Sequence, residues 1–374
     1  MEPFKNLISP EIVRLIGVLI AKQLPEFNAA RFQSKVLAEL DQLEMKERVA
    51  LIADTLHAAL PKAGHERLPV LLTTLHPDTE SKDVQSSEDG LSSWGIWPLT
   101  HLIGTYGLDD FEASLAALKE MTKRHTSEFD VRPFIVADQA RALGIICAWA
   151  DDPSHHVRRL VSEGTRPRLP WGVQLKELVA DPTPMIPTLK KLRDDPSEYV
   201  RRSVANHLND IAKDHPNLVA DLSVDWLKDA SKEREKLVRH ACRTLIKQGH
   251  EGALSAFGLH PPEIEEPKIT LAADALNFGG EIEFDVSVTS VGQGAQTLVI
   301  DYVIHFLKAN GTLAPKVFKW TKLDLKAGES KQLSRRHGIK PITTRKYYDG
   351  QQVLSLRING KDFGEAPFEL KGAT

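Results

Sequence analysis

The chain has 374 residues, of which 41% are hydrophobic and 26% charged, and its formal net charge is −3 at pH 7. It contains no run of about 18 apolar residues, which excludes a membrane-spanning helix, and it lacks the basic and apolar regions of a signal peptide. The two cysteines, Cys147 and Cys242, lie far apart in helical sequence, so we expect no disulfide framework and a reducing compartment.

Residues 1–260 have the apolar spacing of helices. Apolar residues recur three and four positions apart, for example in residues 11–24 and 111–125. An acidic, polar segment with glycine, residues 76–99, interrupts this pattern, and we expect a loop there.

One pattern occurs twice in the helical part. Asp-Asp-Pro-Ser-x-x-Val-Arg-Arg occupies residues 151–159 and returns at 194–202, and a weaker echo follows at 238–240. In each copy we expect the second Asp as N-cap and Pro as first helical residue, with a capping box between Asp195 and Glu198. Helical repeats of about 40 residues are typical of HEAT-like helix pairs, which stack into a solenoid with a concave surface. The repeat alone favours a binding module over an enzyme.

The sequence changes character after a linker rich in proline and glutamate, residues 261–267. Residues 268–374 alternate apolar and polar residues in short runs that end at glycine-containing turns. About seven such strands suit an antiparallel sandwich of the immunoglobulin type. We therefore predict a multidomain chain, with an all-α HEAT-like solenoid over 1–260 and an all-β immunoglobulin-like sandwich over 268–374.

The first copy of the repeat is followed by unusual residues. Arg159 and Glu163 are four apart and share a helix face. The helix ends soon after Glu163 because glycine and two prolines follow, which puts Arg166 and Arg168 on an irregular loop suited to phosphate oxygens. Trp171 comes next: such a residue by default packs in the core, but in a basic groove it would face a nucleobase.

The later copies place similar residues at helical spacing. Arg202, Asn206 and Asp210 share one face in the second copy. The third copy has Arg239, Arg243 and Lys247 at the same spacing. If these faces are concave, they form a basic groove that contains two carboxylates. Each carboxylate then either pairs with a neighbouring arginine or stabilises a cation.

Three segments, residues 127–135, 155–171 and 197–216, resemble the signature segments of the AlkC family of bacterial DNA-3-methyladenine glycosylases. These are relatives of the AlkD glycosylases in the HEAT-like alkylpurine glycosylase superfamily. The resemblance extends over the helical part, and the remainder is similar to AlkC proteins with an appended immunoglobulin-like domain. It implies a monofunctional DNA repair enzyme that excises cationic N3-methylated bases, 3-methyladenine and 3-methylcytosine, from duplex DNA without full base flipping.

The resemblance also implies site residues: Glu128, Glu163, Trp171 and Asp210. In our hypothesis Asp210 positions water and stabilises the sugar cation, Glu163 and Glu128 hold the nucleotide, and Trp171 packs against deoxyribose or base. This suits the chemistry, because an N3-methylated base already carries positive charge and leaves without being protonated. Carboxylates near the sugar supply the electrostatic stabilisation and the general base.

Basic residues supply the candidate DNA contacts, and we expect about half of those in the helical part to touch phosphate. In the helical part they are, together with one amide, Arg132, Arg158, Arg159, Arg166, Arg168, Arg201, Arg202, Asn206, Arg239 and Arg243. In the sandwich they are Arg335, Arg336, Lys340, Arg345 and Lys346, which form either a solvated basic loop or, as we favour, a second DNA clamp.

No histidine pair has the spacing of a metal site with a carboxylate ligand, so we expect neither metal nor cofactor. The expected partner is double-stranded DNA that contains alkylated bases, bound by a monomer in the bacterial cytoplasm without membrane or obligate protein partner. The alternative function is a non-catalytic HEAT-repeat scaffold that binds damaged or bent DNA.

Overall fold

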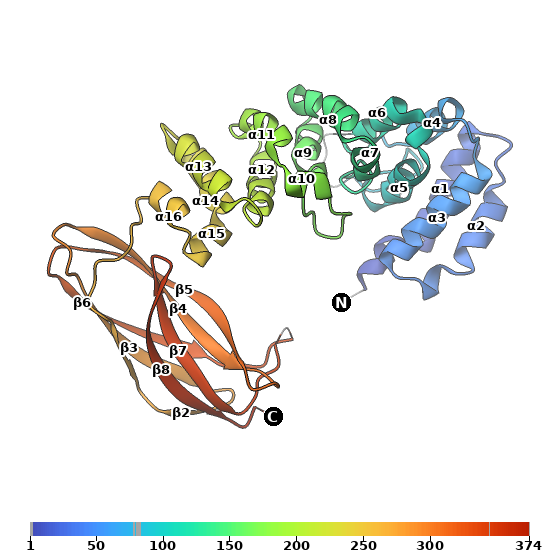
Figure 1. The fold of residues 1–374 in the computed structure, drawn as a ribbon. Coiled ribbons are helices and arrows are strands. Elements are labelled where there is room, and N and C mark those ends of the chain that lie inside the picture. The colour runs from blue at the N-terminus through green and yellow to red at the C-terminus, as the bar shows by residue number, and fades with distance from the viewer. Residues whose placement is uncertain (1–2, 78, 80–83, 344, 374) are drawn as a thin grey trace. The chain divides into compact units, whose positions relative to one another are not determined.

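The computed structural model describes residues 3–77, 79, 84–343 and 345–373. The chain divides into two compact units. Unit 1 comprises Met1–Asp214 and Ser231–Ala241, and unit 2 comprises His215–Ala230 and Cys242–Thr374. Figure 1 shows the helices of unit 1 and the strands of unit 2.

Unit 1 is built from helices that pack in pairs, including α3 on α5, α9 on α12 and α12 on α14. Its α-helices are α1 (Pro10–Gln23), α2 (Ala29–Leu37), α3 (Met45–Ala59), α4 (Gly64–Thr73), α5 (Trp97–Tyr106), α6 (Phe111–Met121), α7 (Arg132–Ala137), α8 (Gln139–Ala148), α9 (His155–Gly164), α10 (Lys176–Ala180), α11 (Ile186–Leu192), α12 (Glu198–Ile211) and α14 (Lys232–Ala241). The predicted helical repeat is confirmed.

The loop predicted at residues 76–99 lies partly outside the described residues, since 78 and 80–83 are not among them. The last residues of this segment are helical. A 3-10 turn, Ser93–Ile96, leads directly into α5, whose first residue Trp97 is buried in the core of unit 1.

Both copies of the Asp-Asp-Pro-Ser turn have the same local structure, but its cap differs from the predicted one. Ser154 and Ser197 are the N-caps, so each helix begins two residues after the proline. The Asp152 carboxylate accepts a hydrogen bond of 2.9 Å from the backbone N–H of Ser154, and Asp195 accepts one of 2.8 Å from Ser197. The predicted Asp N-cap and capping box are therefore wrong, because each aspartate forms an Asx turn with the residue two positions later.

The first arginine of each Arg-Arg pair holds this turn in place. Arg158 Nη1 donates to the carbonyls of Asp152 (2.9 Å) and Pro153 (2.8 Å). Arg201 Nη1 does the same with Asp195 (2.6 Å) and Pro196 (3.0 Å). The repeated arginine thus satisfies carbonyls that precede the helix, which explains why the motif occurs twice.

Unit 2 contains an antiparallel sandwich with helices beside it. Its helices are α13 (Pro216–Leu227), α15 (Arg243–Gln248) and α16 (Glu251–Ala256). The strands are β1 (Lys268–Leu271), β2 (Ala275–Asn277), β3 (Glu281–Thr289), β4 (Gln296–Leu307), β5 (Leu313–Leu325), β6 (Ser330–Gly338), β7 (Gly350–Ile358) and β8 (Lys361–Lys371). One sheet has the order β1-β3-β6 and the other β2-β8-β7-β4-β5, with β2 parallel to β8. Phe284, Tyr302 and Leu356 lie in the core between them.

Within unit 2, α15 packs directly on the turn between β7 and β8. Gly249 and Gly360 both have positive φ, 77° and 81°, and a Cβ at either position would overlap the backbone of the other. Arg357 Nη1 also donates to the carbonyl of Lys247 at 3.0 Å. The last helices therefore belong with the sandwich, and whether residues 1–260 fold as a domain bounded at 261–267 stays a prediction.

The helix predicted to carry Arg239, Arg243 and Lys247 on one face is interrupted. Helix α14 ends at Ala241, and Cys242 is the N-cap of α15. Arg239 and Arg243 consequently lie on different helices, so this part of the predicted basic stripe is wrong.

Candidate active site

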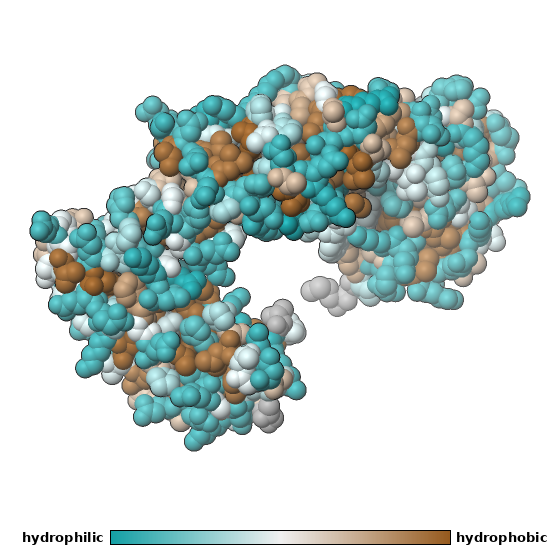
Figure 2. All heavy atoms as spheres, viewed as in Figure 1, coloured by the Kyte–Doolittle hydropathy of each residue, from teal (hydrophilic) through white to brown (hydrophobic). Residues whose placement is uncertain are grey.

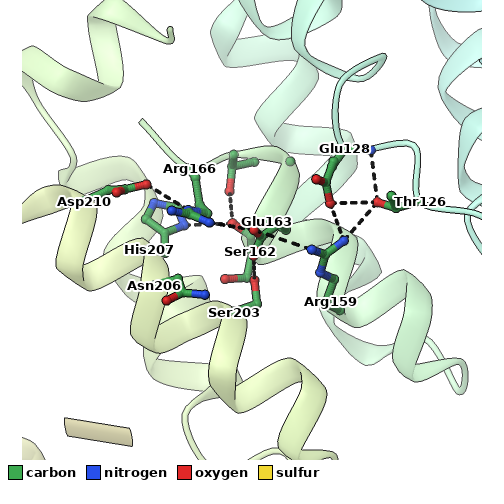
Figure 3. A network of polar contacts seen from close by, with 12 residues as sticks. Thr126, Glu128, Arg159, Ser162, Glu163, Arg166, Ser203, Asn206, His207 and Asp210 are labelled. Atoms are coloured by element: carbon green, nitrogen blue, oxygen red, sulfur yellow. Dashed lines mark hydrogen bonds and ion pairs between the residues drawn. The ribbon is translucent and has the colours of Figure 1, made fainter. Parts of the chain in front are cut away.

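Three carboxylates and two arginines form one network in unit 1 (Figure 3). Glu163 lies in the last turn of α9, and its Oε1 accepts a 2.6 Å hydrogen bond from Arg166 Nη1 and lies 3.4 Å from Arg159 Nη2. Its other oxygen accepts a 2.6 Å hydrogen bond from Ser203 Oγ on α12. Every acceptor oxygen of this side chain therefore has a partner.

Arg166 connects Glu163 to the acid of the next repeat. Its Nε donates to Asp210 Oδ2 at 2.8 Å, and Asp210 lies in the last turn of α12. The other oxygen of Asp210 accepts from Lys213 Nζ at 3.0 Å. One guanidinium therefore fixes two carboxylates that are 47 positions apart in the sequence.

Arg159 connects Glu163 to the third acid. Its guanidinium pairs with Glu128, in the segment between α6 and α7, and donates to Thr126 Oγ1 at 2.9 Å. Thr126 in turn donates to Glu128 at 3.0 Å. The ring of Tyr199 lies 5.0 Å from the Arg159 guanidinium carbon, a cation–π distance.

The network is buried and charged. Glu163 and Asp210 are only 5% and 2% exposed. Burial by itself would raise the pKa of Glu163, but Arg159 and Arg166 outweigh it and hold that pKa below its ordinary value. The carboxylates conversely raise the pKa of both arginines, against the opposing effect of burial. Glu163 is thus an anion at neutral pH.

His207 lies within this network without adding charge to it. Its Nδ1 is 2.9 Å from the carbonyl oxygen of Ser162, and burial lowers its pKa to about 4. The ring is therefore neutral at pH 7, and its Nδ1–H donates to that carbonyl. The positive charge near the acids comes from arginine and lysine.

Trp171 does not pack in the core. Trp171 is 66% exposed, and its backbone φ of 65° lies in the left-handed region that aromatic residues rarely adopt. The exposed indole is five positions after Arg166, within the loop between α9 and α10. It is therefore available to a ligand.

Arg132 must be removed from the candidate phosphate contacts. The residue is fully buried, and its guanidinium donates to the carbonyls of Gly164 (2.8 Å), Arg166 (2.9 Å) and Val173 (2.6 Å). Burial lowers its pKa to about 10, so it stays charged at neutral pH. Its role is to hold the loop after α9.

Other predicted contacts are engaged within the protein. Arg158 donates two hydrogen bonds to Asp195, of 2.6 and 3.0 Å, which link the two copies of the repeat. Arg166 is buried in the network, and Arg201 is half-buried against its turn. Arg168 makes two 2.8 Å hydrogen bonds to Asp214. The side chains of Arg158, Arg159 and Arg166 are only 14%, 14% and 9% exposed, and ion pairs within the protein occupy their guanidinium groups, so these three predicted phosphate contacts are wrong.

The remaining candidates lie closer to solvent. Arg202 is exposed and 3.9 Å from Glu198, whereas Asn206 Oδ1 is 3.0 Å from His240 Nε2. Arg239 and Arg243 are exposed too. On the face of the molecule shown in Figure 2, hydrophobic residues occur in small groups among hydrophilic ones.

The five basic candidates of the sandwich, which we call its basic segment, differ in exposure. Arg335, Arg336, Lys340 and Lys346 are exposed, and Arg336 pairs with Glu283 at 3.1 Å. Arg345 is half-buried, with its guanidinium carbon 4.2 Å from the centre of the Phe306 ring. The exposed members are the ones available to a polyanion.

Neither a metal nor a membrane site is evident in the part of the chain that the structure describes. No three His, Cys, Asp or Glu side chains there are grouped so that they could hold a metal ion. No described helix is both long enough and apolar enough to cross a bilayer.

Known proteins resemble this chain over nearly its whole length. The family model described as the C-terminal Ig-like domain of the uncharacterised protein YhaZ matches residues 265–372. Uncharacterized protein YhaZ of Bacillus subtilis (strain 168) is 36% identical over 372 residues, which cover 99% of this chain and 100% of the relative. The structure of Pseudomonas fluorescens alkylpurine DNA glycosylase AlkC, bound to DNA with an abasic site analogue, is 37% identical with a TM-score of 0.85. It covers 99% of this chain, and this chain covers all of it.

The chain belongs to the AlkC family. The resemblance found in residues 127–135, 155–171 and 197–216 is thereby confirmed, as is the two-part fold with an immunoglobulin-like sandwich. Each AlkC-like segment contributes one acid to the network.

Sequence reasoning missed several residues that surround the acids. Ser203 is the clearest, and a signal for it exists: it occupies the position that the buried Leu160 has in the first copy of the repeat. A hydroxyl at an apolar position of a repeat indicates a buried polar partner. Thr126 and Lys213 carry no comparable signal, because their contacts depend on how neighbouring segments pack.

Proposed function

We propose that this protein is a monofunctional DNA glycosylase that hydrolyses the N-glycosidic bond of cationic N3-methylated bases in duplex DNA. The substrates are 3-methyladenine and 3-methylcytosine, and excision proceeds without full base flipping. The observation that carries the proposal is the Glu128–Glu163–Asp210 network, in a chain 37% identical to an alkylpurine DNA glycosylase solved on abasic DNA. The proposed partner is therefore alkylated double-stranded DNA, bound by a monomer.

The chemistry requires anions rather than a proton donor. The C1′–N bond breaks with its electron pair moving to the cationic base, which leaves as a neutral molecule. The deoxyribose becomes oxocarbenium-like, and ionised carboxylates stabilise it. Water then forms the new C1′–O bond and loses one proton to a carboxylate acting as general base. The products are the free base and an abasic site.

Asp210 is the acid to which we assign the water. Its Oδ2 is fixed by Arg166, whose guanidinium is buried, so this oxygen orients the carboxylate. Its Oδ1 accepts from Lys213, whose side chain is 47% exposed. We therefore assign Oδ1 to the water and sugar, while Glu163 and Glu128 hold the cationic nucleotide and Trp171 packs against it. Asp210→Asn should abolish excision; full activity in Asp210→Asn with loss in Glu163→Gln would reverse these roles.

A second function is favoured by one observation. Glu163 and Asp210 are both satisfied by Arg166, which gives them a structural use in a chain that only binds DNA. A non-catalytic HEAT-repeat scaffold for damaged or bent DNA would retain these ion pairs, since they join neighbouring repeats.

Release of free bases separates the two functions. Duplex DNA treated with N-methyl-N-nitrosourea is incubated with the full chain in EDTA, and the released bases are identified by chromatography. A glycosylase of the proposed kind releases 3-methyladenine in the presence of EDTA, because no metal takes part in its reaction. It also releases 3-methylcytosine when the substrate contains that base. A folded chain that binds the DNA but releases no base is the scaffold.

A further inference from the structure

We propose that Lys46 is a positioning residue for Trp171. Lys46 lies at the start of α3 and is 125 positions away from Trp171, yet its Nζ donates a 2.7 Å hydrogen bond to the Trp171 carbonyl oxygen. The effect of Lys46 on excision rests on the proposed function. Its effect on the conformation of Trp171 does not, and can be measured separately.

The backbone conformation of Trp171 must be stabilised by contacts from other residues. A φ of 65° places a large side chain in the left-handed region, where its Cβ approaches its own carbonyl oxygen. Such a conformation persists only when surrounding contacts fix it. Because the indole is mostly exposed, its own packing supplies little of that fixation.

Buried contacts fix the loop on either side of Trp171. Arg132 holds the carbonyls of Gly164 and Arg166 before it and of Val173 after it. Gly172 lets the chain pass close to this guanidinium, since a Cβ there would lie 3.2 Å from Arg132 Nε. The peptide that follows Trp171 has a contact on each side: its N–H, from Gly172, donates to the Leu169 carbonyl at 3.1 Å, and its carbonyl oxygen accepts from Lys46.

The hydrogen bond from Lys46 to the Trp171 carbonyl affects where the indole points. Rotation of the Trp171 carbonyl requires a change in backbone angles at Trp171, and relaxation toward ordinary φ values moves the side chain with it. Arg166, in the same loop, donates hydrogen bonds to two of the three carboxylates, Asp210 and Glu163. By fixing the carbonyl, Lys46 holds the exposed indole in one orientation relative to the carboxylate network.

Fluorine NMR tests the conformational part without any substrate. The full chain is labelled with 5-fluorotryptophan, and the Trp171 resonance is identified as the one missing from Trp171→Phe. We expect Lys46→Met to shift or broaden this resonance alone. Lys62→Met is the matched control, because Lys62 Nζ also donates to an exposed carbonyl, that of His57, at 3.0 Å. An unchanged Trp171 resonance in Lys46→Met would overturn the proposal.

Single-turnover excision tests the functional part. Loss of one hydrogen bond to a charged group should slow excision about tenfold in Lys46→Met and leave Lys62→Met near wild type. In a Trp171→Phe background, the Lys46→Met change should have less than about a twofold effect, because Lys46 acts through the indole.

The remaining outcomes are distinct. A full Lys46→Met effect that persists in Trp171→Phe, with the log–log salt slope of DNA binding smaller by about one, would make Lys46 a phosphate contact instead. If the wild type excises no base, the proposed function fails, and the NMR result still decides whether Lys46 holds Trp171.

Discussion

Glu163 and Asp210 lie on adjacent helices and share the guanidinium of Arg166, which donates to them at 2.6 and 2.8 Å. Neither acid is placed by its own helix alone, since α9 must pack on α12 for the bridge to form. The carboxylate arrangement is thus a consequence of repeat stacking, and the arginine that fixes it comes from the loop that ends the first repeat.

Replacing Arg166 should damage both folding and excision. Arg166→Met leaves two buried carboxylates without their shared partner and should lower the free energy of unfolding by about 3 kcal/mol or more. Arg166→Lys should recover part of this loss but not excision, because one ammonium lacks the planar fork that spans both acids. Urea unfolding and single-turnover excision measure the two effects.

The control for Arg166 is Arg168→Met. Arg168 also pairs with an aspartate through two hydrogen bonds, but its side chain is 33% exposed and that of Asp214 is 28% exposed. We expect a much smaller loss of stability there, because solvent screens this pair. Equal stability losses in the two variants would contradict the special position of Arg166.

Arg158 should be purely structural. Its side chain is largely buried and bridges the two copies of the repeat through Asp195. Arg158→Met should therefore reduce the free energy of unfolding by up to about 3 kcal/mol, while the folded fraction excises at the wild-type rate. Thermal unfolding and excision per folded molecule check this, and a slower rate in fully folded protein would show that Arg158 contributes to the site.

The stability of unit 1 should depend on pH through His101. Its Nδ1 lies 3.3 Å from the Asp130 carboxylate, and this hydrogen bond raises the His101 pKa above the ordinary 6.5, against the effect of burial. A raised folded pKa means that the stabilisation is complete below pH 6.5 and is lost as pH rises through the folded value.

We therefore expect the difference in unfolding free energy between wild type and His101→Gln to be largest in mildly acidic buffer and to shrink toward alkaline pH. Urea unfolding over a pH series measures it, with the exposed His65→Gln as control. A difference that grows with pH would have the wrong sign for this pair.

Charge in the sandwich should contribute to DNA binding. Arg335 and Lys340 are exposed in the basic segment, so Arg335→Gln with Lys340→Gln should reduce the log–log salt slope by about two. The control pair, Lys308→Gln with Lys326→Gln, removes the same charge from exposed turns elsewhere in the sandwich. Identical slopes for the two double variants would show that only net charge matters.

The features that sequence predicted well are those with local patterns. Period-two alternation identified the strands of the sandwich, and the repeated Val-Arg-Arg identified the stacked helices. Glu163 and Arg159 could be paired from their spacing, since residues four apart share a helix face.

The features that sequence missed depend on packing between distant segments. Arg132 has the composition of a phosphate contact, yet the loop after α9 folds over it and takes its hydrogen bonds. The contact between Lys46 and Trp171 joins α3 to that loop, and no local pattern relates them. The Asx turns at Asp152 and Asp195 moved each N-cap by two residues, because short polar side chains can bond either to a helix or to the turn before it.

Single-turnover release of 3-methyladenine by wild type, Asp210→Asn and Asp214→Asn tests the central claim most directly. Both aspartates pair with an arginine of the loop after α9, so the two variants remove comparable charge from nearby positions. We predict that Asp210→Asn binds methylated duplex DNA but excises at least about a hundredfold more slowly, whereas Asp214→Asn excises normally. Equal excision by two folded variants would contradict a catalytic role for Asp210.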